Sequence, residues 1–271
     1  MKVIVSHDVD HITCFEHRKD LILPKFFLRN LIETFNGTIP FREMMLRSAI
    51  VFQNQWQRIA EVMEFDRQQG IPSTFFVGVN QGSKLAYSLK NAAYWIKRIH
   101  ENGFDVGVHG IDYTTMDGVQ KEFETFRQIL PDVPFGIRMH YLRRNEDTLG
   151  FMEAAGYQFD SSIRVHEGPF KTGNLWEFPL HIMDGDMINQ GKRYGSKSFV
   201  QVQDFTRREI EKVHQKNIPY LTLLFHDRYF HPGFSLWKAW YEWAISYFRE
   251  SGFTFTNYLS AIHDLESGIS N

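Results

Sequence analysis

The sequence has one cysteine and no long apolar run, and these two shortages exclude several kinds of protein. The single thiol, Cys14, cannot form an internal disulfide framework, which fits a reducing compartment. No stretch approaches the roughly 20 apolar residues of a membrane-spanning helix. Asp8 and Asp10 interrupt any apolar core within the first fifteen residues, so we recognise no secretory signal there. We therefore expect a cytoplasmic protein with no membrane span.

An excess of one charge is also missing. The 30 Lys and Arg residues against 32 Asp and Glu residues leave a net charge of −2, so nucleic acid is not expected as a partner. Hydrophobic residues are abundant at 43% of the chain, including 25 Phe, which is enough for a large core. We find no repeat and no linker-like run, so the 271 residues are expected to form a single domain. The sequence gives no indication of the oligomeric state.

Short apolar runs alternate with helical patterns along the chain, which is typical of parallel β/α units. Residues 15 to 69 are mostly helical in pattern and rich in Phe and Arg. The expected strands lie in the segments 3–5, 74–79, 105–110, 135–142, 156–162, 176–184, 218–230 and 253–257. The expected later helices lie near 91–101, 118–130, 146–155 and 204–216, with a last one that contains Leu236 to Tyr247. About seven parallel strands in one domain predict an α/β fold, a distorted (β/α) barrel.

Polar residues stand where several of these strands end. Asp8 and Asp10 end the first strand and point the same way, because side chains alternate between the two faces of a strand. Two carboxylates on one face repel each other unless a cation or a shared proton intervenes. Further polar strand ends are His109, Arg138 to Tyr141, and His226 with Asp227. The carboxyl ends of barrel strands meet at one mouth, so these side chains are expected to converge there.

These residues, in this order, resemble the motifs of the NodB-type polysaccharide deacetylases, carbohydrate esterase family 4. HDVDH resembles the first motif, DVGVHG the second, GIRMHY the third, AGYQFDSS the fourth and TLLFHD the fifth. The resemblance runs from Val3 to about Ile262, and residues of about 15–60 look like a subfamily insertion. It implies a NodB-like barrel and a hydrolase acting on a carbon–nitrogen bond that is not a peptide bond.

The resemblance also implies roles for single residues. Asp8 matches the catalytic base, while Asp10 and His109 match metal ligands. Arg138 would lie against the base, and the backbone N–H of Tyr141 would face the substrate oxyanion.

The last two motifs imply the acid and its neighbour. His226 matches the catalytic acid, and Asp160 is the residue implied to orient it. A pKa near or above 7 would suit His226, and a carboxylate such as Asp160 or Asp227 beside it would favour that value.

Two positions depart from the family pattern. The family's second motif has another histidine four residues after the first, and this chain has Tyr113 there. Asp112, His11 or His140 is a candidate for the third ligand of a divalent metal, most consistent with zinc. His140 itself stands where the third motif has a proline. The alternative is that the metal has been lost, as in metal-independent relatives of this superfamily.

The resemblance implies removal of N-acetyl groups from an amino sugar or an oligosaccharide substrate. A polysaccharide precursor in O-antigen or capsule biosynthesis is the expected setting. Two alternatives stay open, namely a metal-independent hydrolase of a ureido or formyl amide and a non-catalytic carbohydrate-binding relative. Trp176, Phe178 and Trp237 are either a sugar-stacking wall or part of the core. His17, His100, His214 and His263 are expected at the surface because their contexts are helical or polar.

Overall fold

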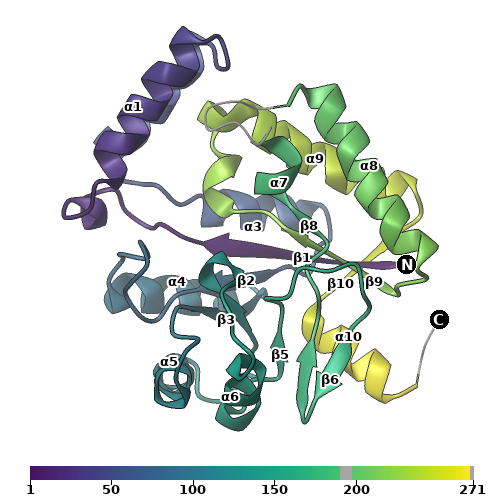
Figure 1. The fold of residues 1–271 in the computed structure, drawn as a ribbon. Helices are drawn as coiled ribbons and strands as arrows, with labels where there is room; N and C mark the ends of the chain where they lie inside the picture. The colour runs from purple at the N-terminus through teal and green to yellow at the C-terminus, as the bar shows by residue number, and fades with distance from the viewer. Residues whose placement is uncertain (190–196, 269–271) are drawn as a thin grey trace.

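A computed structural model describes residues 1–189 and 197–268 of the chain (Figure 1). Its strands form one curled sheet in the order β6-β7-β5-β4-β3-β2-β1-β9-β8, and β10 also pairs with β1. Neighbouring strands are parallel, apart from β6 and β7, which are antiparallel. The strands are β1 (Lys2–Val9), β2 (Thr74–Val77), β3 (Asp105–Gly110), β4 (Ile137–Met139), β5 (Phe159–Asp160), β6 (Phe170–Thr172), β7 (Leu175–Glu177), β8 (Ile182–Met183), β9 (Tyr220–Leu224) and β10 (Thr254–Thr256).

The central strand β1 separates two apolar cores because its side chains alternate between the faces of the sheet. Val3 and Val5 point outward into the larger core, which lies between the sheet and the helices. Ile4 points inward into a smaller cluster with Phe76, Phe159, Phe178, Tyr220, Tyr258 and Ala261. Burial on both faces explains why this strand reads as an unbroken apolar run.

Helices cover the outside of the curled sheet (Figure 1). In α4, the Ser88 side chain caps the amino end by accepting from the Asn91 amide, and the predicted apolar stripe that includes Trp95 is buried. No helix in the described parts of the chain is long and apolar enough to cross a membrane. The helices are α1 (Ile22–Phe35), α2 (Phe41–Gln53), α3 (Ile59–Gln68), α4 (Leu89–Glu101), α5 (Met116–Ile129), α6 (Thr148–Ala155), α7 (Asp184–Ile188), α8 (Phe199–Gln215), α9 (Ser235–Glu250) and α10 (Tyr258–Glu266), with short 3-10 turns at Phe15–His17, His140–Leu142, Asp227–Phe230 and Pro232–Phe234.

Helix α1 protrudes from the barrel at the edge where the carboxyl ends of the strands lie (Figure 1). It packs on α2, and we call residues 21–53, which contain both helices, the arm. The helical pattern expected for this part of the sequence is therefore present.

The α/β barrel prediction is confirmed, with three corrections of detail. The segment 176–184 forms two strands rather than one, because Pro179 lacks the N–H that a continuous strand would need. The hairpin strand β6 was not predicted, and neither was α10. Among the described residues no pairing joins β6 to β8, so the barrel stays open between these two strands.

Candidate active site

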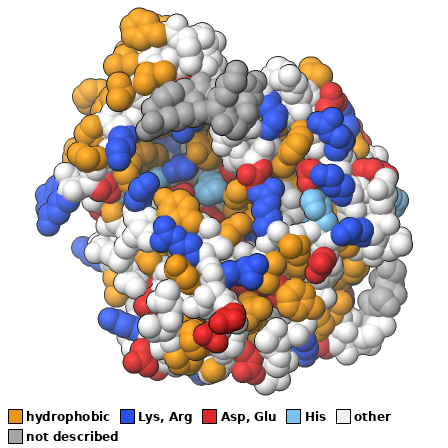
Figure 2. Space-filling view, in the orientation of Figure 1, with side chains coloured by type: hydrophobic (Ala, Val, Ile, Leu, Met, Phe, Trp, Pro, Cys, Tyr) orange, Lys and Arg blue, Asp and Glu red, His pale blue; other side chains and the backbone are white. Residues whose placement is uncertain are grey.

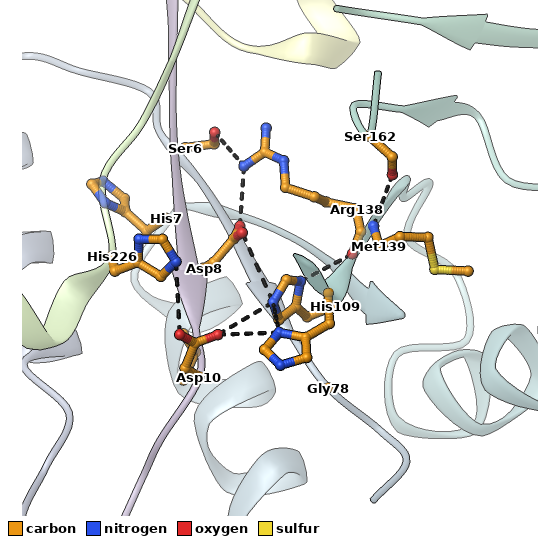
Figure 3. Close-up of polar contacts among 12 residues, drawn as sticks. Ser6, His7, Asp8, Asp10, Gly78, His109, Arg138, Met139, Ser162 and His226 are labelled. Atoms are coloured by element: carbon orange, nitrogen blue, oxygen red, sulfur yellow. Dashed lines mark hydrogen bonds and ion pairs between the residues drawn. The ribbon is translucent and has the colours of Figure 1, made fainter. Parts of the chain in front are cut away.

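Two buried groups at the centre of the barrel mouth form a direct ion pair. Nη1 of Arg138, from β4, donates to Oδ1 of Asp8, from β1, at 3.0 Å (Figure 3). The same guanidinium donates to the Ser6 hydroxyl at 2.8 Å and to the Ser161 carbonyl at 3.0 Å. A planar guanidinium with several fixed acceptors holds the Asp8 carboxylate in one orientation.

Beside this pair, three ligand-type atoms face one another. Nε2 of His109 lies 3.0 Å from Nδ1 of His140, and each of these nitrogens lies 3.4 Å from Oδ1 of Asp10. All three side chains are buried, and together they are a group that can hold a metal ion. Oδ1 of Asp10 has no hydrogen-bond partner among the described residues.

The outer nitrogens of both rings fix the state of the inner ones. Nδ1 of His109 lies 3.0 Å from the Arg138 carbonyl, and Nε2 of His140 lies 3.1 Å from the Ser83 carbonyl. A carbonyl oxygen only accepts, so in neutral rings these outer nitrogens carry the hydrogen atoms. The inner nitrogens then present lone pairs to each other and to a carboxylate oxygen. These electron-rich atoms repel one another unless a cation, either a metal ion or a proton, lies between them.

The spacing of the three atoms fits zinc. Zinc–nitrogen bonds of about 2.0–2.1 Å give a tetrahedron whose edges are about 3.3–3.4 Å long. The triangle formed by Asp10, His109 and His140 has edges of 3.4, 3.4 and 3.0 Å, close to one face of that tetrahedron. Histidine ligands of zinc commonly donate their second N–H to a backbone carbonyl, as both rings do here. The residues present therefore fit a divalent metal, with His140 as the third protein ligand.

His226 lies on the other side of Asp10, and a carboxylate holds its ring. Its Nδ1 lies 3.0 Å from Oδ1 of Asp184, and its backbone N–H donates to Oδ2 of the same residue at 2.7 Å. Its Nε2 lies 3.7 Å from Oδ2 of Asp10 (Figure 3). Burial alone would lower the pKa of His226, but the Asp184 and Asp10 carboxylates outweigh it and raise that pKa to about 10. The imidazole is thus protonated at neutral pH.

Cationic groups surround Asp10. Burial would raise its pKa, yet the positive charges of His226, the larger cause, and of the Arg228 guanidinium help to hold that pKa well below the usual range. Nη2 of Arg228 lies 3.7 Å from Oδ2 of Asp10. The lowered pKa favours the ionised carboxylate of Asp10, which is the form that binds a metal.

Tyr141 follows His140 in a strained turn. Its φ of 60° and the φ of 54° at Leu142 place two consecutive large residues in the left-handed region, at a cost of about 1–2 kcal/mol each. Such strain persists at sites where function needs it. Here the turn places the Tyr141 side chain on the wall of a cavity.

Two of the three residues that the sequence offered as a third ligand, Asp112 and His11, are not part of the cluster of ligand atoms. Asp112 accepts from the hydroxyl of Thr114 at the start of α5, and His11 uses its Nδ1 on His17 at 2.8 Å and stacks on Trp56. Tyr113, at the family's histidine position, packs against the outer core.

The carboxylate that contacts His226 also differs from the expectation. Asp160 was the candidate to orient His226, with Asp227 as another neighbour, and the contact belongs to Asp184 instead. Asp160 lies on β5 and accepts from Ser162 at 2.5 Å, whereas β8, which leads into Asp184, pairs with β9, which leads to His226. Asp227 accepts from the Arg58 amide. Asp184 ends an expected strand segment, so its position at a strand end was the signal that could have identified it.

A cavity of about 540 Å³ opens above the site, and Figure 2 shows a hollow with histidine at its floor. The barrel mouth supplies Asp10, His140 and Tyr141, and the arm supplies one wall, including Phe26. Among the aromatic residues considered for a sugar-stacking wall, Trp237 lines this cavity and stacks on Tyr229 at 3.9 Å. Phe178 lies in the barrel core instead, with Trp176 packed against that core.

Solved structures of other proteins identify the fold of this chain. No protein-family model matches the chain, and no curated protein does. Among solved structures, a candidate polysaccharide deacetylase from Mycobacterium smegmatis superimposes with a TM-score of 0.63 at 15% identity, over 96% of this chain and 88% of that one. The chain has the fold of the polysaccharide deacetylases.

Two further solved structures share this fold. A candidate polysaccharide deacetylase from Pseudomonas aeruginosa PAO1 gives a TM-score of 0.59 at 13% identity, over 94% of this chain and 87% of that one. Puue allantoinase gives a TM-score of 0.61 at 13% identity, over 96% and 88% of the two chains. At these identities the likeness is one of fold, and the NodB-type fold that the motifs implied is confirmed.

Proposed function

We propose that this chain is a metal-dependent hydrolase that removes N-acetyl groups from an amino sugar. The proposal rests mainly on the trio of Asp10, His109 and His140. Their ligand atoms face one another beside the Asp8–Arg138 ion pair. This arrangement puts a cation site and a candidate base in the same buried mouth.

In this proposal Asp8 is the general base. Its carboxylate is fixed by Arg138 and lies 3.8 Å from Nε2 of His109 through Oδ2. It takes the proton of the attacking water, and the hydrogen bond from Arg138 keeps the carboxylate aimed. A bound divalent ion supplies Lewis acidity, which makes water more acidic and polarises the acyl carbonyl.

His226 is the general acid. The Asp184 and Asp10 carboxylates keep its imidazole protonated, and Asp184 fixes the ring through Nδ1 so that Nε2 faces the site. The proton on Nε2 goes to the leaving amine as the carbon–nitrogen bond breaks. The backbone N–H of Tyr141 is the proposed donor to the oxyanion.

The cavity supports a sugar as substrate. Trp237 and Tyr229 offer flat apolar surface, and polar side chains such as Asn30 offer hydrogen bonds. We infer a nucleotide-linked or lipid-linked amino sugar in cytoplasmic steps of cell-surface polysaccharide assembly, such as O-antigen or capsule.

A second candidate function is metal-independent hydrolysis of another amide. A single proton shared between His109 and His140 would also satisfy the facing lone pairs, and Puue allantoinase has a similar TM-score to the deacetylase structures. In that case the His–His pair is an acid–base element instead of a metal site.

The test measures metal content and acetate release together. Protein purified without added metal or chelator is analysed for metal, then assayed with tri-N-acetylchitotriose and with UDP-N-acetylglucosamine before and after chelation. We expect close to one metal per chain, loss of acetate release on chelation, and recovery with zinc. Activity that survives complete removal of metal would favour the second candidate.

Two aspartate variants sharpen this test. Asp8→Asn keeps the size of the side chain and is expected to lower kcat by about 10²–10⁴-fold while the metal stays bound. Asp112→Asn, which changes an aspartate outside the trio, is the matched control and should behave as wild type. If Asp8→Asn kept most of the activity, Asp8 would not be the base.

A further inference from the structure

The arm carries an outward apolar face. We define the outer face as the following seven residues, which make up half of the large hydrophobic side chains that are exposed in the described chain: Leu21, Leu28, Leu31, Phe35, Phe41, Met45 and Phe52. Phe35 is 88% exposed and Phe52 is 85% exposed. Figure 2 shows hydrophobic side chains gathered over this protruding part of the molecule. An exposed patch of this kind marks a surface that meets an apolar partner.

The outer face is separate from the cavity. At 100° per residue, Leu28, Leu31 and Phe35 fall on the side of α1 opposite Phe26 and Glu33, which line the cavity. The same spacing sets the exposed residues of α2 opposite its own cavity residues.

The same geometry holds for α2 in detail. Phe41, Met45 and Phe52 follow one another at steps of four and seven residues and form one stripe, while Glu43 and Arg47 line the cavity from the other side. Each helix of the arm therefore has one face toward the cavity and one apolar face toward solvent. A binding partner can therefore cover the outer face and leave the cavity open.

The arm and its base carry an excess of positive charge. Four cations of the arm and its base have no ion-pair partner in the described parts of the chain: Arg18, Lys19 and Arg42, and also Lys25, which lines the cavity. Of the acidic residues of residues 15–53, Glu33 pairs with Arg29 and Arg47, and Glu43 pairs with Arg47 and accepts from Ser235. Glu16 accepts from the uncharged Ser88 and Asn91, and Asp20 bonds to His17.

This charge distribution decides between two apolar partners. Residues 15–53 hold six Lys and Arg against four Asp and Glu, a balance of +2 in a chain whose net charge is −2. A second copy of the arm would bring one surface of net positive charge against another. An anionic lipid surface offers both an apolar layer for the Phe and Leu side chains and negative charge for the cations.

We propose that the outer face of the arm binds the surface of an anionic lipid bilayer. The Phe35 and Phe41 side chains, at the turn between α1 and α2, enter the boundary between headgroups and acyl chains. Arg18, Lys19 and Arg42 stay at headgroup level. This inference does not depend on the proposed function.

The experiment is sedimentation of the full chain with vesicles. Vesicles of phosphatidylglycerol and phosphatidylcholine are compared with vesicles of phosphatidylcholine alone, at about 0.1 and 0.5 M salt. We expect binding to the anionic vesicles that weakens at high salt. The double variant Phe35→Ser/Phe41→Ser should lower the partition coefficient at least tenfold. The charge variant Arg18→Gln/Lys19→Gln/Arg42→Gln should lower it on anionic vesicles in particular.

A matched control changes exposed apolar residues away from the arm. Leu89→Ser/Val200→Ser removes side chains that are 48% and 63% exposed on α4 and α8, and should bind as wild type. Circular dichroism checks that each variant is folded. Absence of binding to anionic vesicles, or equal binding by the Phe35→Ser/Phe41→Ser variant, overturns the proposal. A dimer in solution that this variant dissociates overturns it as well, because the face would then belong to a second copy.

Discussion

His140 and Tyr113 are the two residues at which the chain departs from the pattern that it otherwise resembles. At the scale of single residues the two departures compensate each other. In the proposed metal site, His140, which stands where the third motif has a proline, takes the place of the histidine that the second motif lacks, and its Nδ1 lies 3.0 Å from Nε2 of His109. The ring is held from behind by the Ser83 carbonyl, which lies in a turn with φ of 47° at Ser83 and 78° at Lys84.

His140→Ala is therefore expected to weaken zinc binding by about 100-fold or more, because one of three protein ligands is lost. Tyr113→Phe removes only a phenol oxygen and should leave the affinity unchanged. Competition titration with a zinc chelator of known affinity measures both. Equal affinity of the His140→Ala variant and wild type would place the third ligand elsewhere.

Asp184 is the second residue to test at this scale. Since Asp184 is the largest cause that raises the pKa of His226 to about 10, Asp184→Asn should bring that pKa down toward its ordinary range. NMR titration of the His226 ring measures the change directly. The variant should also lower kcat by about 10–100-fold and shift the alkaline limb of the pH profile to lower pH.

Asp160→Asn is the comparison for Asp184→Asn. Its side chain bonds to Ser162 and not to His226, so the pKa of His226 should stay near that of wild type. A larger shift with Asp160→Asn than with Asp184→Asn would restore Asp160 as the orienting residue.

The sequence was informative about residues that end strands and less so about the partners of those residues. Asp8, His109, Arg138 and His226 converge because the ends of parallel strands meet at one mouth. Partners depend on which strands are neighbours in the sheet, and the sequence does not state the sheet order. The expectation that His17 lies at the surface was wrong for a related reason. Its polar sequence context indicated the surface, but the fold buries its side chain against His11.

At the scale of elements, Glu122 joins α5 to the strand end that carries His109. Its carboxylate accepts from the Ile111 amide at 3.1 Å and from the Asn80 side chain at 3.1 Å. Burial outweighs these hydrogen bonds and raises the pKa of Glu122 to about 7, from an ordinary value of 4.5. The folded protein thus binds this proton more tightly than the unfolded chain does.

Glu122 therefore stabilises the fold fully below pH 4.5, and this contribution is lost as the pH rises through about 7. Glu122→Gln cannot ionise, so its free energy of unfolding should fall less between pH 5 and pH 8, by about 2–3 kcal/mol relative to wild type. Urea unfolding at the two pH values measures the difference. Glu124→Gln, at an exposed site on the same helix, should show no such change, and a change as large in that variant would count against burial as the cause.

Elements were easiest to predict where one periodicity ran without interruption. The stripe of α4 and the apolar runs of β1 and β9 are continuous, so their positions agree with expectation. The hairpin of β6 and β7 is short, and the burial of β6 is only partial, so it left no apolar run to recognise. Helix α10 does have an apolar stripe, because Tyr258, Ala261, Ile262 and Leu265 face the barrel interior at helical spacing, so this pattern was in the sequence and was missed.

At the scale of the whole molecule, one side chain links the site to the far end of the barrel. Arg138 touches Asp8 and Ser6 on β1, the Ser161 carbonyl after β5, and the Tyr258 hydroxyl on α10 at 2.7 Å. It also lies 4.5 Å from the Phe76 ring centre. The last helix, which the sequence analysis did not predict, thus helps to hold the group that aims the candidate base.

Tyr258→Phe removes one acceptor from this buried guanidinium and leaves the ring in place. Hydrogen bonds to charged groups contribute about 1.5–3 kcal/mol, so we expect a loss of that size in the free energy of unfolding. Tyr157→Phe is the matched control, since the Tyr157 hydroxyl is equally buried and has no hydrogen-bond partner in the described chain. That control should be neutral or slightly stabilising, because it removes an unsatisfied polar group. Denaturant unfolding measures both variants, and kcat should fall several-fold only for Tyr258→Phe, since only that tyrosine supports Arg138 against Asp8. Equal stability changes in the two variants would mean that Arg138 is held without the help of α10.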